Sequence, residues 1–213
     1  DYVTPQIYWS IGFEAASYDI LADWWVNETK GRPIHLYIGQ AAYKIDNNFD
    51  TRWSDPEEYP RQIHLNHQYE TIKGSMHFSL KDLNRNPLGI KDRLASDLYR
   101  YPALVPTMPW LDNEPPKKPK LRDAKRVAEG VEITIEDHHL NEDTAYYVIY
   151  RFDGNKRGSI DDAANILATV RKTDKKQTFI DETAEPGKTY TYVVTAVDRL
   201  HNESGINRSV TVR

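Results

Sequence analysis

A stretch of prolines and charged residues, residues 113–119, divides the chain into two parts that differ in hydrophobic pattern. Proline restricts φ and has no amide hydrogen, so this composition is typical of a linker. Upstream, short apolar runs alternate with amphipathic segments, and all five tryptophans lie there; downstream, apolar and polar residues alternate over short runs. We therefore predict two domains, residues 1–112 and 121–213, joined by a linker over residues 113–120.

The first part alternates strand-like and helix-like segments. We expect strands over residues 2–8, 34–42 and 74–79, and helices over residues 17–27, 59–73 and 87–99. Alternation at this spacing predicts a parallel sheet. Three βα units cannot close a barrel by themselves. Two interpretations follow, a small open α/β domain or the last three units of an eightfold barrel.

The second part has the pattern of an all-β domain. Val131, Ile133 and Ile135 alternate with polar residues, which predicts a half-buried strand. Further strands are expected over residues 146–152, 166–170, 178–180, 189–198 and 209–212, with turn residues between them. Roughly seven short strands over about a hundred residues are typical of a β-sandwich.

Composition excludes several classes of function. The net charge of −4 argues against a nucleic-acid binder, because phosphate neutralisation needs a clustered basic face. The absence of cysteine excludes disulfides and cysteine-based zinc sites. No stretch approaches the about 20 apolar residues of a membrane helix, so no membrane span is expected. The abrupt start inside a predicted strand suggests a fragment of a longer protein.

Histidines provide no convincing metal site. His64, His67 and Glu70 share one face of a predicted helix, a spacing that can bind a metal. With no further ligand in view, a surface stripe is the favoured interpretation. His138 and His139 are expected in an exposed turn. We predict no metal and no cofactor.

Four segments of the first part resemble, in order, the bacterial glycosyl-hydrolase-like family ten. Residues 1–9 resemble its sixth barrel strand, residues 35–45 its seventh, residues 74–79 its eighth, and residues 104–110 the tail after its last helix. The resemblance implies the C-terminal part of a TIM (β/α)8 barrel that acts on bacterial cell-wall strands or other polysaccharides. It also implies an extracytoplasmic location, whether periplasmic, cell-surface or secreted.

The second part resembles a fibronectin type III domain. Residues 185–198 are similar to its sixth strand, with Tyr190 at the tyrosine-corner position. The core tryptophan usual on its second strand is replaced, and Ile135 is the expected replacement. The predicted fold class is thus α/β, the last three βα units of a TIM barrel, plus an all-β fibronectin type III-like sandwich.

Candidate sugar-binding residues follow the predicted strands, because barrel active sites lie at the carboxyl ends of their strands. Alternation points Gln6 and Tyr8 into the barrel, with Trp9 at the rim and Tyr43 and Lys44 at the mouth. Aromatic rings stack on the apolar faces of sugars, and an amide donates to and accepts from hydroxyls. The alternatives are that Tyr8 and Trp9 pack beneath a helix, and that Lys44 is a solvated loop residue.

No catalytic residue can be assigned. Glycosidases need two carboxylates that flank the scissile bond, and no predicted strand end offers one. The loop residues Glu14, Asp46, Asp50 and Asp55 are expected to be solvated. In the resembled family the acidic residues proposed to act lie on earlier strands.

The leading hypothesis is a fragment of a glycoside hydrolase that contributes sugar-binding residues but not the catalytic carboxylates. The alternatives are a non-catalytic glycan-binding or scaffold protein with a degenerate barrel, and a surface adhesion module. Expected partners are a glycan substrate and the upstream part of the same barrel. Exposed strand edges also predict self-association.

Overall fold

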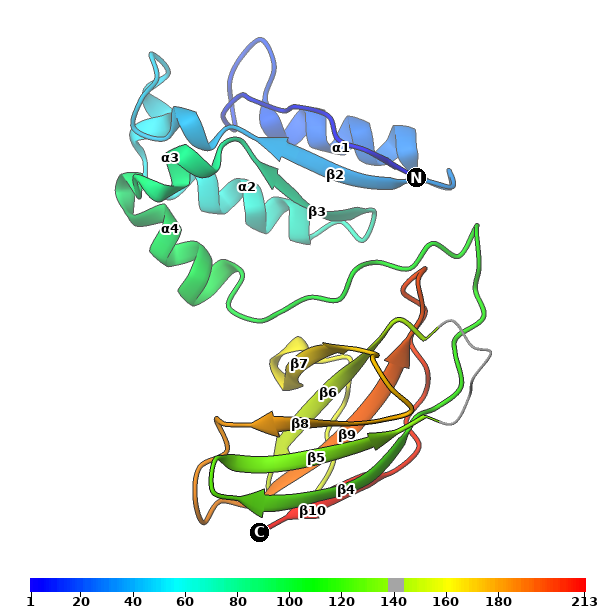
Figure 1. Ribbon diagram of the computed structural model, residues 1–213. Coiled ribbons are helices and arrows are strands. Elements are labelled where there is room, and N and C mark those ends of the chain that lie inside the picture. Colours follow the sequence, from blue (N-terminus) through cyan, green and yellow to red (C-terminus); the bar gives the residue numbers. More distant parts are fainter. Residues whose placement is uncertain (138–143) are drawn as a thin grey trace. The chain divides into compact units, whose positions relative to one another are not determined.

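The computed structural model describes residues 1–137 and 144–213, in two compact units, Asp1–Arg100 and Tyr101–Arg213 (Figure 1). The division lies earlier than residue 112, because residues 101–112 pack with the second unit. Leu104 contacts a core cluster of that unit, and Asn202 Nδ2 donates to Asp112 O at 3.3 Å. Trp110 therefore belongs to the second unit. The predicted turn at His138 and His139 lies outside the described residues.

The first unit contains a parallel sheet in the order β1-β2-β3. Its strands are β1 (Tyr2–Val3), β2 (His35–Gln40) and β3 (Ile72–His77). The predicted strand over residues 2–8 is regular for only two residues, because Pro5 has no amide hydrogen to continue the ladder. Contact resumes beyond it, where Ile7 N donates to Gly39 O at 3.0 Å.

Two helices, α1 (Tyr18–Thr29) and α2 (Glu58–His67), cover one face of this sheet (Figure 1). The apolar residues of the strands point toward them and form one buried cluster, with members Ile7, Leu36, Ile38, Ile72, Tyr18, Ala22 and Val26. The helix predicted over residues 59–73 was too long, and β3 begins two residues earlier than predicted. Ile72 fits a helical spacing, but it is a core residue of β3.

Short elements surround the carboxyl ends of the strands. They are η1 (Ala42–Lys44), η2 (Thr51–Ser54), α3 (Leu80–Asn84), η3 (Pro87–Gly89), α4 (Ile90–Arg93) and η4 (Leu94–Leu98). The helix predicted over residues 87–99 is helical over residues 87–98 but is divided into η3, α4 and η4, and α3 was not predicted. Leu88 and Gly89 have positive φ values of 51° and 74°, a conformation that interrupts a right-handed helix.

The second unit is an antiparallel sandwich of two sheets, in the orders β10-β9-β6-β7 and β4-β5-β8. Its elements are β4 (Lys120–Val127), β5 (Gly130–Glu136), β6 (Tyr146–Asp153), η5 (Ala163–Asn165), β7 (Ile166–Arg171), β8 (Lys176–Asp181), β9 (Tyr190–Val197) and β10 (Ser209–Val212). The predicted fold class, a parallel βα segment followed by an antiparallel sandwich, is confirmed. Strand β4 was not predicted, because its charged residues obscure the alternation.

The core of the sandwich matches the expected pattern. Ile135 is buried on β5 in a cluster that includes Ile133, Tyr147 and Tyr192. Tyr190, at the start of β9, accepts a hydrogen bond at its Oη from Glu185 N at 3.4 Å. That contact confirms the predicted tyrosine corner.

Across the described residues, no helix combines the length and the apolar character needed to cross a membrane.

Candidate sugar-binding cleft

A cleft of about 310 Å³ lies on the face of the sheet that α1 and α2 leave uncovered. Alternation along the strands separates its residues from the apolar set beneath the helices. Its lining residues are Tyr2, Thr4, Gln6, Tyr8, Gly39, Met76, His77 and Phe78.

Gly39 allows the segment after β1 to approach β2 at the floor of the cleft. A Cβ atom at this position would lie 3.2 Å from Pro5 O and 3.3 Å from Gln6 Cα. Gly39 N also donates to Pro5 O at 2.8 Å. The segment around Pro5 thus packs directly on Gly39, and this contact places Gln6 over the floor of the cleft.

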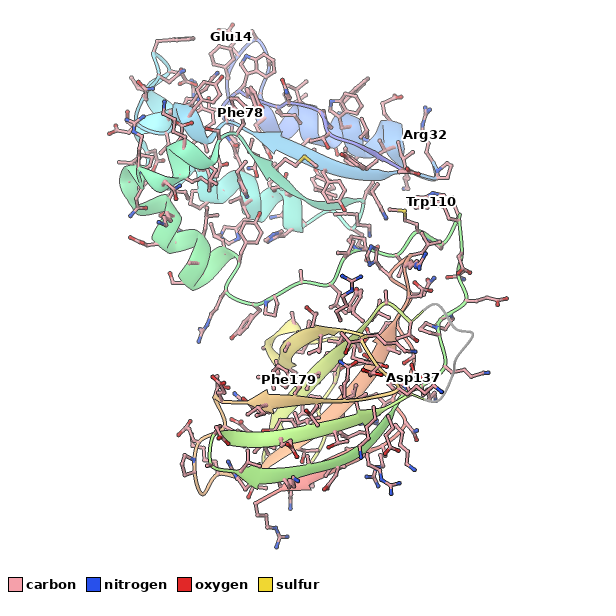
Figure 2. All side chains as sticks on the ribbon, in the orientation of Figure 1. Glu14, Arg32, Phe78, Trp110, Asp137 and Phe179 are labelled. Atoms are coloured by element: carbon pink, nitrogen blue, oxygen red, sulfur yellow. The ribbon has the colours of Figure 1, made fainter. Side chains whose placement is uncertain are left out.

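Three aromatic rings gather at the carboxyl end of the sheet, and we call Tyr8, Tyr43 and Phe78 the aromatic cluster. The ring centroids lie 5.8 Å apart for Tyr8 and Tyr43, 6.3 Å for Tyr8 and Phe78, and 6.0 Å for Tyr43 and Phe78. Figure 2 shows Phe78 at the opposite end of the sheet from Arg32, which precedes β2. Phe78 is 58% exposed, so its ring is available for stacking.

The backbone supports this cluster. Tyr43 N donates to Phe78 O at 3.1 Å, which joins the segments that follow β2 and β3. Burial, and secondarily the nearby Tyr43, raises the pKa of the Tyr8 phenol. Tyr8 therefore stays neutral around neutral pH and can both donate and accept a hydrogen bond.

Lys44 has a partner within the protein. Its Nζ donates to Tyr8 O at 2.6 Å and lies 6.0 Å from the ring centroids of both Tyr43 and Trp53. Burial lowers the pKa of Lys44, and the nearby carboxylate of Asp50 partly opposes this shift. The ammonium group holds the end of the first strand against the segment after β2.

The structure brings most of the predicted sugar-binding residues together. Gln6 and Tyr8 line the cleft. The Tyr43 ring contacts that of Tyr8, and Lys44 Nζ donates to Tyr8 O. Trp9 is 38% exposed and is not among the lining residues, while its carbonyl accepts from Gln62 Nε2 at 3.3 Å. Their role in binding sugar stays a prediction.

Sequence reasoning missed other lining residues, above all Met76 and Phe78. Both lie in the predicted strand over residues 74–79, at alternate positions. The rule that placed Gln6 and Tyr8 at the end of the first strand, applied to the third strand, could have found them.

Two carboxylates near this end of the sheet are structural. Asp50, predicted to be solvated, is buried and accepts hydrogen bonds from Ser10 Oγ and from Arg52 N at 3.2 Å. Glu58, also buried, accepts from Ile11 N at 2.8 Å and Gln62 Nε2 at 2.9 Å. These bonds fix the segment after the first strand, and the described lining of the cleft contains neither Asp nor Glu.

Within residues 1–137 and 144–213, no three His, Cys, Asp or Glu side chains are grouped so that they could hold a metal ion. His64 and His67 are exposed on α2, as a surface stripe predicts. The His67 ring lies 5.9 Å from that of Tyr99, centroid to centroid.

Comparison with known proteins finds a family model that matches a stretch of each part. Residues 1–55 match the family described as Glycosyl hydrolase-like 10, and residues 133–213 match the Fibronectin type III domain SaeA third domain. Glycosyl hydrolase YngK of Bacillus subtilis (strain 168) is 63% identical over 214 residues, which cover 99% of this chain and 41% of that protein. Glycosyl hydrolase DigH of Escherichia coli (strain K12) is 37% identical over 90 residues, which cover 40% of this chain and 20% of DigH.

Among solved structures, a Fn3-like protein from Clostridium thermocellum aligns with 47% of this chain and 94% of its own, at 22% identity and a TM-score of 0.36. The chain spans less than half the length of the two curated relatives, YngK and DigH. From the two family matches, the chain carries a glycosyl hydrolase-like 10 segment followed by a fibronectin type III-like domain.

Proposed function

We propose that the whole protein is a glycosidase that hydrolyses O-glycosyl bonds in a polysaccharide or cell-wall glycan. This chain supplies part of the sugar-binding surface and not the catalytic carboxylates. The observation that carries the proposal is the aromatic cluster beside Gln6, in a cleft at the carboxyl ends of parallel strands. The similarity to two proteins named glycosyl hydrolases supports it.

The chemistry of the cleft suits a sugar ring. The exposed face of Phe78 stacks on the C–H groups of a pyranose, and the Gln6 amide donates to and accepts from ring hydroxyls. The neutral Tyr8 phenol adds a further donor. Lys44 acts on the backbone of Tyr8 and so keeps the cluster in one arrangement. The two carboxylates that glycoside hydrolysis requires come from upstream strands in this proposal.

The test uses the full-length protein and measures the release of reducing ends from polysaccharides and from isolated cell-wall glycan. Phe78→Ala and Gln6→Ala each remove a sugar contact of about 1–2 kcal/mol, so kcat/KM falls about five- to thirtyfold. Trp24→Ala removes an exposed ring from α1 and is the control, with unchanged activity. Full activity in both cleft variants would contradict the sugar-binding role.

The isolated chain is expected to release no reducing ends, because its cleft has no carboxylate pair. Hydrolysis by residues 1–213 alone would contradict the proposal that the catalytic carboxylates come from upstream strands.

A non-catalytic glycan-binding or scaffold protein is the second candidate, favoured by the absence of a carboxylate from the described lining of the cleft. The same assay separates the two. If the full-length protein binds glycan but releases no reducing ends, and if Phe78→Ala lowers its affinity for glycan, the protein is a binding protein.

We also propose an extracytoplasmic location, on the basis of the family resemblance. Fractionation of the native host, with detection of the full-length protein by antibody, tests this. Recovery in the cytoplasmic fraction alone would contradict it.

A further inference from the structure

The sandwich contains a pocket that the proposed glycosidase function does not use. It has a volume of about 310 Å³ and lies where β6 ends and β7 begins. Its lining residues are Arg151, Asp153, Ala164, Asn165, Ile166 and Leu167. Among the described strands, β7 pairs with β6 alone, so the pocket lies at an edge of the sheet.

The guanidinium group of Arg151 is held rigidly at this pocket. Its Nη1 donates to the two oxygens of Asp181 at 3.2 and 2.9 Å and to Thr183 Oγ1 at 2.7 Å. The guanidinium carbon lies 4.8 Å from the ring centroid of Tyr190. An arginine fork offers five N–H donors, and those of Nε and Nη2 donate to no residue in the described part of the chain. They are available to a ligand.

The carboxylate of Asp181 forms an ion pair with Arg151 and neutralises its charge. Asp181 is 1% exposed and also accepts from Tyr192 Oη at 2.8 Å. Burial alone would raise the pKa of Asp181, but hydrogen bonds from Thr183, Tyr192 and Arg151 outweigh it and lower the pKa. The carboxylate is therefore ionised, and the pair presents fixed donors without excess positive charge.

Acceptors and aliphatic surface complete the pocket. Asn165 Nδ2 donates to Ser159 O at 3.0 Å, which leaves the amide oxygen of Asn165 as an acceptor. Asp153 is exposed, and no ion pair joins it to Arg151 within the described residues. Ala164, Ile166 and Leu167 add aliphatic atoms. The lining thus combines one fixed cation, one carboxylate, one amide oxygen and a small apolar surface.

We propose that this pocket binds an uncharged sugar ring, as an accessory glycan site on the sandwich. A hydroxyl group both donates and accepts, so it satisfies the donors of Arg151 and the acceptors of Asp153 and Asn165 together. An anion is repelled by the exposed Asp153. A cation meets the N–H donors of Arg151, which offer it no acceptor, and an apolar ligand leaves these polar groups desolvated and unpaired. The volume is at the lower end of the range for ligand pockets, which fits one end of an oligosaccharide.

The test is a ¹H–¹⁵N NMR titration of residues 1–213. The neutral ligands are tetramers of glucose and of N-acetylglucosamine, and a galacturonic acid tetramer is the negatively charged comparison. The neutral sugars produce saturable shifts at the amides of Asn165, Ile166 and Leu167 and at Arg151 Nε. Asp153→Asn removes a charged acceptor and weakens binding about tenfold. Asp174→Asn, an exposed change elsewhere on the sandwich, leaves binding unchanged.

Gln6→Ala separates this site from the cleft of the first unit. The shifts around Leu167 persist in that variant whether or not the cleft binds sugar, so the two proposals can fail independently. The accessory site is overturned by an absence of saturable shifts up to about 10 mM neutral sugar. It is overturned equally by a preference for galacturonate, or by equal affinities of Asp153→Asn and the parent chain.

Discussion

Asp50 links two segments at the carboxyl end of the first sheet. It accepts from Ser10 Oγ, which follows the first strand, and from Arg52 N and Nη1 at 3.2 and 3.0 Å. Burial alone would raise the pKa of this carboxyl. The hydrogen bonds from Ser10 and Arg52 prevail and hold the pKa below its ordinary value of 3.8. The ionised side chain therefore stabilises the segment that carries Tyr8 and Trp9 toward the cleft.

Replacing Asp50 by Asn should lower the free energy of unfolding of the first unit by about 1–3 kcal/mol near neutral pH. The folded-state pKa lies below the unfolded one, so the contribution of Asp50 is complete above 3.8 and is lost as pH falls through the folded-state pKa. Urea unfolding at several pH values, followed by tryptophan fluorescence, measures the difference. Asp46→Asn, exposed in the same loop, is the control. A loss that persists undiminished at low pH would contradict the linkage.

At the scale of elements, the contact between the first two strands depends on Gly39. Beyond the two residues of β1, the strands meet through hydrogen bonds between Gly39 and the neighbours of Gln6. A side chain at Gly39 would meet this backbone at 3.2–3.3 Å. A Cβ atom at position 39 would therefore require the first strand to move away from β2 by a few tenths of an ångström.

Gly39→Val should cost about 1–3 kcal/mol through overpacking, and Gly39→Ala should cost less. Native-state hydrogen exchange checks this at the Ile7 amide, which donates to Gly39 O. We expect the Ile7 amide to exchange fastest in Gly39→Val, more slowly in Gly39→Ala and most slowly in the parent chain. Equal protection of Ile7 in all three chains would show that β1 is held by other contacts.

The core of the sandwich is packed around Ile135 rather than a tryptophan. Ile135 of β5 lies in a buried cluster that also contains Tyr147 and Val194 of the other sheet. Cores at native density tolerate lost volume and added volume poorly. Restoring the residue type that fibronectin type III domains usually carry is thus expected to harm this particular domain.

Ile135→Trp should destabilise the sandwich by about 1–3 kcal/mol and lower its thermal midpoint by about 4 °C or more. Differential scanning calorimetry measures the midpoint. Ile180→Trp places the same ring at an exposed position of β8 and should have little effect. An unchanged or raised midpoint in Ile135→Trp would mean that the core retains room for the larger ring.

At the scale of the whole molecule, the first unit presents open parallel edges and an uncovered sheet face. In the described chain, β1 and β3 are the outer strands of their sheet. Tyr2 and Met76, which line the cleft, are 60% and 42% exposed. Unpaired edges and contiguous apolar surface favour association with another chain.

We expect residues 1–213 by themselves to associate reversibly with increasing concentration. Co-expression with the upstream barrel strands proposed above is expected to suppress this association. Sedimentation velocity over a range of concentrations measures the association. Met76→Lys on β3 should weaken it, whereas Ile20→Lys, at an exposed site on α1, should not. A monomer at every concentration tested would show that exposure of this sheet face to solvent does not drive association.

Most of the fold could be predicted from local patterns. The alternation of Val131, Ile133 and Ile135 identified β5, and the apolar spacing after Ser17 identified α1. Prediction failed where local pattern is ambiguous. Ile72 satisfies the helical and the strand periods alike, and Leu88 gives no sign in the sequence of its left-handed backbone.

The sequence by itself determined the alternation of strands and helices in the first part and the all-β character of the second. It also determined which face of the first strand turns toward the helices, and hence that Gln6 and Tyr8 lie on the opposite face. These follow from periodicity, which is a property of neighbouring residues. Only the tertiary structure decided that Phe78 joins Tyr8 and Tyr43, that Lys44 binds the carbonyl of Tyr8, and that Asp50 is buried. Such contacts join residues far apart in the chain, and their geometry depends on strand register and loop paths that no local spacing specifies.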